Sequence, residues 1–126
     1  MSAKRGWSRV MELVLAGIML LSLPLAAGAA TANGITSPKD GATVSGKVDV
    51  MGYASDPDFQ KWQLDVLPGG DPNAAISLAV GNNPGEFSYT VDTTKFPNGD
   101  HALRLRVVRS DSNYNEYVTK FSIANR

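Results

Sequence analysis

The sequence predicts an all-β fold, a β-sandwich of seven strands preceded by an N-terminal signal-peptide helix. Beyond residue 32, short segments alternate apolar and polar residues with the period of two that is typical of half-buried strands. Clusters of Gly, Pro, Asn and Asp separate these segments, and none of them has a helical period of useful length. Seven short strands with such spacing are typical of a sandwich.

The N-terminus has the features of a bacterial signal peptide. The basic residues Lys4, Arg5 and Arg9 precede an apolar run over 13–23, and small residues follow. We therefore expect residues 1–32 to be a signal peptide, cleaved after Ala29 or Ala32, and residues 33–126 to be the domain.

An uncleaved anchor is the alternative, because residues 13–30 are about long enough to cross a bilayer. Glu12, Pro24 and Gly28 argue against it.

Composition excludes several classes of protein. The 126-residue chain has no cysteine, so it forms no disulfide, has no thiolate site and carries no lipid-modified cysteine. Residues 31–126 contain nine Lys or Arg and eleven Asp or Glu. A nucleic-acid-binding face needs clustered basic residues, and only Arg104, Arg106 and Arg109 approach a cluster. We expect no nucleic-acid partner.

The first strand is interrupted. Pro38 and Gly41 bracket a turn between two short edge segments, and an edge strand tolerates proline because it has unpaired donors. The second strand covers 48–54. A glycine within it, Gly52, indicates close approach by a large neighbour.

Three strands follow, over 59–67, 75–80 and 86–92, separated by the turn clusters 68–73 and 81–85. Trp62, Leu64 and Val66 share one face of the first of these strands, with Trp62 expected in the core, and Phe87, Tyr89 and Val91 alternate with Ser88 and Thr90 in the last.

The strongest strand pattern lies within 97–111. Pro97, Asn98 and Gly99 form a tight turn. The strand that follows has one mostly apolar face and one face that carries two arginines. The apolar face is His101, Leu103, Leu105 and Val107, and the other is Ala102, Arg104, Arg106 and Val108. The last strand covers 115–124, with Tyr117, Thr119, Phe121 and Ile123 on one face.

Two stretches resemble bacterial immunoglobulin-like or fibronectin-III-like extracellular modules. They read Ile35-x-x-Pro38-x-x-Gly41-Ala42-x-Val44-x-Gly46-x-Val48-x-Val50-x-Gly52-x-Ala54 and, after Asp92-Thr93-Thr94, Asn98-Gly99-x-His101-x-Leu103-Arg104-Leu105-x-Val107. The resemblance spans 35–125 and implies an antiparallel immunoglobulin-like sandwich. Such modules are often appended to secreted glycosidases, penicillin-binding proteins and adhesins. These are turn and core positions, so they specify the fold and hardly any activity.

The resemblance implies structural roles for two residues. Trp62 matches the core aromatic residue of the third strand. His101 matches the corner before the sixth strand, where the family commonly has a tyrosine whose hydroxyl bonds to backbone, and an imidazole can make a similar bond. Val91 stands where many relatives have tryptophan, so packing under that turn is expected to differ, and the cysteine pair of antibody-like domains is absent.

Catalysis by a Ser-His-Asp arrangement would have to use His101, the only histidine. Its place on an apolar strand face favours a core or corner role, so we expect no enzyme and no catalytic residue. One histidine without cysteine does not make a zinc site, and we expect no cofactor and no metal.

Asp111-x-Asn113-x-Asn115 has the oxygen spacing that opens a calcium loop. Glu116 and Ser122 then stand where such a loop needs Gly and Glu. We expect a solvated hairpin loop. A weak calcium site from two loops, with Asp56 and Asp58, stays open.

The outward face of the third and sixth strands presents Gln63, Asp65, Arg104 and Arg106 as neighbours in one sheet. Cross-strand charge pairs usually form a solvated face. A docking patch is the alternative. Tyr114 at a hairpin tip, with Tyr53 and Tyr117, could instead stack on sugar rings.

The leading hypothesis is a secreted or cell-surface, non-enzymatic module that contacts a protein partner or associates with itself. Self-association through sheet edges is open, although Pro38 blunts the first edge. The alternative is a carbohydrate- or peptidoglycan-binding module, which requires an exposed aromatic platform. Burial of Trp62 would leave only tyrosines for stacking.

Overall fold

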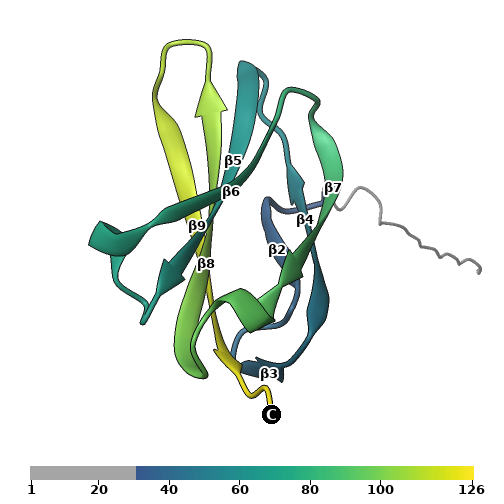
Figure 1. Ribbon diagram of the computed structural model, residues 1–126. Helices are drawn as coiled ribbons and strands as arrows, with labels where there is room; N and C mark the ends of the chain where they lie inside the picture. The colour runs from purple at the N-terminus through teal and green to yellow at the C-terminus, as the bar shows by residue number, and fades with distance from the viewer. Residues whose placement is uncertain (1–30) are drawn as a thin grey trace, which may run out of the picture. The chain divides into compact units, whose positions relative to one another are not determined.

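The computed structural model describes residues 31–126, which form two β-sheets packed face to face (Figure 1). The predicted signal peptide therefore lies almost wholly outside the described residues. Ala32–Arg126 is a compact unit, and all of the described core residues lie within it. This segment therefore contains the core that it needs to fold. No helix in this part of the chain is long and apolar enough to cross a membrane.

The smaller sheet has the order β2-β4-β7 and the larger sheet the order β3-β9-β8-β5-β6. The strands of the smaller sheet are β2 (Gly34–Ser37), β4 (Lys47–Ala54) and β7 (Gly85–Asp92). Those of the larger sheet are β3 (Ala42–Val44), β9 (Tyr114–Ile123), β8 (Gly99–Arg109), β5 (Phe59–Pro68) and β6 (Ile76–Gly81). Two short 3-10 turns, η4 (Pro72–Ala74) and η5 (Thr93–Lys95), lie in the connections.

The prediction of an all-β sandwich is confirmed, and β2 with β3 are the two halves of the interrupted first strand. Counted as one, they give seven strands. β2 pairs antiparallel with β4, and the chain then moves to the other sheet, where β3 pairs parallel with β9. The expected all-antiparallel pairing is therefore wrong at this one edge. The chain changes sheets at the turn around Gly41, which has φ +86°, a value that favours glycine.

The core connects the two sheets through a pair of aromatic rings. Trp62 on β5 is buried and stacks on Phe87 of β7, with ring centroids 4.5 Å apart. A Cβ at Gly52 would lie 2.6 Å from the Phe87 ring and 2.5 Å from the carbonyl oxygen of Gly34. The expectation that a large neighbour approaches Gly52 is confirmed, and that neighbour is Phe87.

Candidate functional site

The four polar residues predicted to share a surface lie side by side on the larger sheet. β5 and β8 are adjacent strands, and their register places Gln63 opposite Arg106 and Asp65 opposite Arg104. Their side chains point away from the smaller sheet, because the alternate residues of both strands, such as Leu64 and Leu105, fill the core. We call this side of the larger sheet the outer face.

The Asp65–Arg104 pair is buried. The arginine donates to Asp65 Oδ2 from Nη2 at 2.8 Å and from Nε at 3.3 Å. Each side chain is only 10% exposed. The expectation of a solvated face is wrong for this pair, because β5 and β8 are inner strands of the sheet, with neighbouring strands on both sides. Each of these two side chains needs the other, because a buried charge without a partner costs folding free energy.

A chain of charges continues across the sheet towards β9. Glu116 lies 3.9 Å from Arg104 Nε and accepts a hydrogen bond from Arg106 Nε at 2.6 Å. The guanidinium of Arg106 also lies 4.5 Å from the centre of the Tyr114 ring. We call Asp65, Arg104, Glu116 and Arg106 the charge ladder. The ion pairs hold these four side chains in place, so the centre of the outer face is ordered before a partner binds.

Exposed valines border the charge ladder. Val118 lies opposite Arg104 on β9 and Val80 lies opposite Gln63 on β6. Both are 53% exposed, among the highest exposures of large apolar side chains in the described part of the chain. Together with the ordered polar groups, these two side chains add apolar area to the outer face.

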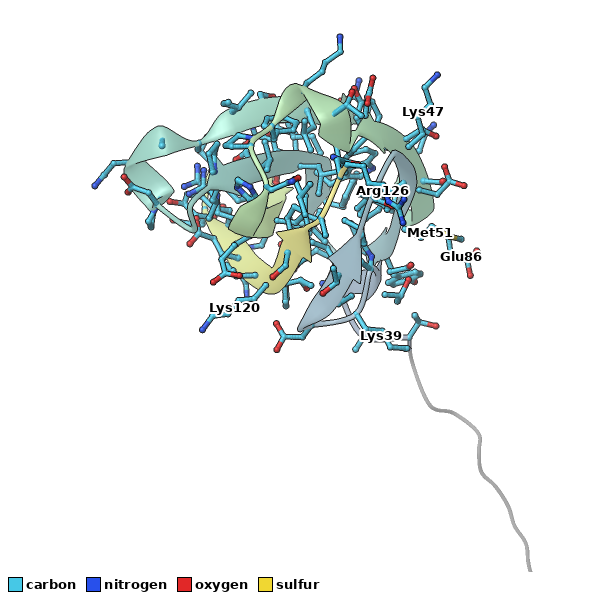
Figure 2. All side chains as sticks on the ribbon, turned by 60° about the horizontal axis from the view of Figure 1, so that its bottom comes forward. Lys39, Lys47, Met51, Glu86, Lys120 and Arg126 are labelled. Carbon is cyan, nitrogen blue, oxygen red and sulfur yellow. The ribbon has the colours of Figure 1, made fainter. Side chains whose placement is uncertain are left out.

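A shallow hollow of about 500 Å³ adjoins the ladder on the same face. Its residues include Ala102, Gly69, Gly70, Asp100, Val118 and Lys120. Asp100 accepts a hydrogen bond from the Ser122 hydroxyl, whereas Lys120 makes no ion pair with any residue of 31–126. Figure 2 shows the Lys120 side chain extending away from the sheet. The hollow could receive a polar or acidic side chain of a bound molecule.

His101 has both ring nitrogens bonded to backbone. Nε2 donates to the carbonyl oxygen of Pro97 at 2.7 Å, and Nδ1 accepts from the backbone N–H of Gly69 at 3.1 Å. The residue is 4% exposed, and its ring packs against those of Phe96 and Phe121. This is the tie to backbone that the resemblance implies for the corner position. Neither nitrogen is left to act on a substrate.

The structure does not bring the tyrosines together. Tyr53 lies on β4 in the smaller sheet, Tyr117 packs against the core, and only Tyr114 is exposed on the outer face. One side of its ring is covered by Arg106. Because Trp62 is buried, residues 31–126 present no flat aromatic platform.

In the turn between β8 and β9, the side-chain oxygens that could have bound calcium accept hydrogen bonds from neighbouring residues. Asp111 accepts hydrogen bonds from the backbone N–H and the side chain of Asn113. These bonds, the backbone one first, lower the pKa of Asp111. Asn115 accepts from Arg109. No group of three metal-ligating side chains occurs in the described part of the chain.

Sequence reasoning missed four outer-face residues: Val80, Glu116, Val118 and Lys120. The signal was present, because Tyr114, Glu116, Val118 and Lys120 alternate with the core residues of the last strand. An exposed face has no compositional requirement of its own, so alternation identifies such residues without assigning them a role.

Solved structures with a similar fold include the endo-beta-1,4-mannanase of Thermotoga petrophila, with TM-score 0.60 and 19% identity over 80% of this chain. The chain spans 21% of the mannanase, and the likeness concerns the fold alone. CopC of Methylosinus trichosporium OB3b has TM-score 0.44 and 17% identity, covering 75% of this chain and 96% of its own. Murine CRIg has TM-score 0.41 and 11% identity, covering 75% and 98%.

No curated protein sequence gives a significant match. The family model described as "Bacterial Ig domain" matches residues 34–105, which is more than half of the chain. The match includes β2 to β7 and the first part of β8, where the two sheets and the Trp62–Phe87 stack are formed. The chain therefore belongs to the bacterial Ig domain family.

Proposed function

We propose that this chain is a secreted, non-enzymatic immunoglobulin-like module that binds a protein partner through the outer face of the larger sheet. The observation that carries the proposal is the charge ladder with its rim of exposed valines. Membership of the bacterial Ig domain family supports a surface or extracellular module.

The outer face combines the features of an interaction surface. Its charges are ordered before binding, because Asp65 holds Arg104 and Glu116 holds Arg106. Ordered side chains lose less conformational entropy when a partner docks. Val80 and Val118 supply apolar area at the rim, and Lys120 supplies a charge without an ion-pair partner in residues 31–126. A protein surface with apolar and acidic groups would complement this arrangement.

Site-specific photo-crosslinking in the native cell tests the proposal. A photo-reactive residue at Val118 or Val80 should capture a defined protein, and one at Thr36, on the far sheet, should not. Val118→Ser should reduce the crosslink formed from position 80 by about twofold to fivefold, because it removes apolar contact area and adds a polar group. Equal capture from Thr36, or no effect of Val118→Ser, would show that the outer face is not the interface.

Carbohydrate binding is the competing function, and the dispersed tyrosines do not favour it. A screen of residues 33–126 against glycans and peptidoglycan, followed by tryptophan fluorescence with and without calcium, tests it directly. Saturable binding that is lost in Tyr114→Ala would replace the protein-binding proposal.

A further inference from the structure

Four strands of the described sandwich have an unpaired edge: β2 and β7 in the smaller sheet, β3 and β6 in the larger. An unpaired edge offers backbone N–H and C=O groups to another chain, and proteins usually shorten, bulge or charge such edges. β2 has four residues with a register shift, and Pro38 follows it. β3 has three residues. β6 has a register shift at its pairing with Leu64 and Asp65. These three edges are protected.

β7 is neither short nor bulged, and its two charged residues, Glu86 and Asp92, lie near its ends. It pairs with β4 over eight residues without a shift, from Lys47 opposite Asp92 to Ala54 opposite Gly85. The strand, Gly-Glu-Phe-Ser-Tyr-Thr-Val-Asp, contains no proline and no lysine. It is a long, regular edge that is open to a further strand.

One core-facing side chain of β7 is left partly uncovered at this edge. Phe87, Tyr89 and Val91 all point towards the core, opposite Gly52, Val50 and Val48. Phe87 and Val91 are 8% and 7% exposed, but Tyr89 between them is 36% exposed. Because β7 is the last strand of its sheet, nothing on its far side covers this ring.

We propose that β7 pairs antiparallel with β7 of a second copy of this chain, about a two-fold axis at Ser88. In this register Tyr89 of each copy lies opposite Phe87 of the other, so the two-fold axis creates two such pairs. Aromatic cross-strand pairs are stabilising. Glu86 lies opposite Thr90, and Ser88 lies opposite itself. The result is a continuous six-stranded sheet with the order β2-β4-β7-β7-β4-β2.

Charge excludes the neighbouring register, in which the axis lies one residue later in the strand. A shift of the axis to Tyr89 would keep core side chains on the core side, but it would place Glu86 opposite Asp92 of the second copy. Like charges directly opposite are destabilising. The strand is thus self-complementary about Ser88, which is what an isologous two-fold interface requires. Glu86 projects beside Met51, at the surface next to this edge (Figure 2).

The test is a charge-swap experiment on residues 33–126, which carry the whole described core. Sedimentation equilibrium up to about 1 mM should show a monomer–dimer equilibrium, because one strand pair makes a small, weak interface. Ser88→Lys and Ser88→Asp should each weaken self-association, since each places like charges opposite one another. An equimolar mixture of the two variants should associate about tenfold more tightly than either alone.

Ser77→Lys is the matched control, because Ser77 is an exposed serine on the β6 edge. It should leave the dimer unchanged. Hydrogen exchange should show protection of amides in Gly85–Asp92 that rises with concentration, with no such change in β6.

A monomer at all concentrations would overturn the proposal. So would a dimer that is lost in Ser77→Lys, or one that the mixture of Ser88 variants fails to restore. β7 belongs to the smaller sheet, so the results for the Ser88 variants do not depend on the outer face that is proposed to bind a partner.

Discussion

Replacing Arg104 by methionine should destabilise the domain far more than the same change at Arg106, two residues along the same strand. Arg104→Met leaves the Asp65 carboxylate 10% exposed and without its partner. An unpaired buried charge costs about 3 to 5 kcal/mol, and we expect about 3 kcal/mol because water can reach the outer face once the guanidinium is removed. Arg106 and Glu116 are 27% and 38% exposed. Loss of this exposed pair should cost at most about 1 kcal/mol.

Urea denaturation of residues 33–126 measures both costs. Trp62 is the only tryptophan in this segment, and its stack on Phe87 makes its fluorescence a probe of the core. The double variant Asp65→Leu/Arg104→Met removes both charges and should restore stability to within about 1 kcal/mol of the parent. Equal costs for Arg104→Met and Arg106→Met would refute the reasoning, because they would show that the first pair is as solvated as the second.

Three further predictions concern the framework. Gly52→Ala should lower stability by about 2 kcal/mol, because the new Cβ would lie 2.6 Å from the Phe87 ring and the strand must shift. An unchanged melting temperature would contradict this. His101→Ala should cost about 2 kcal/mol, since it removes a buried ring that packs against Phe96 and Phe121, together with two partly buried hydrogen bonds to the backbone. Faster amide exchange at Gly69 should accompany the loss, and unchanged exchange there would refute the role of the imidazole. The side-chain and backbone hydrogen bonds from Thr94 lower the pKa of Asp92 below its ordinary value of 3.8. Asp92 therefore contributes stability that is fully present above that value and is lost as the pH falls through the lowered pKa. Asp92→Asn should flatten the acid side of the profile of melting temperature against pH, and an identical profile would exclude the effect.

The two proposed surfaces belong to different sheets. The outer face of β5, β8 and β9 would bind a protein partner, whereas the edge of β7 would join two copies. If both hold, each dimer presents two outer faces, and a partner with two sites would bind it more tightly through effective concentration. Substitutions at Ser88 would then weaken partner binding without changing any contact on the outer face.

Local pattern was enough to predict the strands and their core faces. Period-two alternation identified Leu64, Leu103 and Leu105 as core residues, because side-chain direction in a strand depends only on position along it. Turn residues such as Pro97 and Gly99 marked where strands end for a similar local reason. Gly52 indicated a large neighbour, since a glycine in a strand interior is otherwise unfavourable.

What remained undetermined depends on contacts between residues far apart in the chain. Alternation placed Asp65 and Arg104 on outward faces, but only the order β9-β8-β5-β6 made them direct partners with flanking strands that limit their exposure. The parallel pairing of β3 with β9 likewise depends on where the chain changes sheets. By itself the sequence determined a seven-stranded sandwich and the residues that fill it, because alternation and turn chemistry are local. Only the tertiary structure decided which charges are buried and which edge is left open, because strand neighbours, and with them solvent access, are set by the order of strands in each sheet.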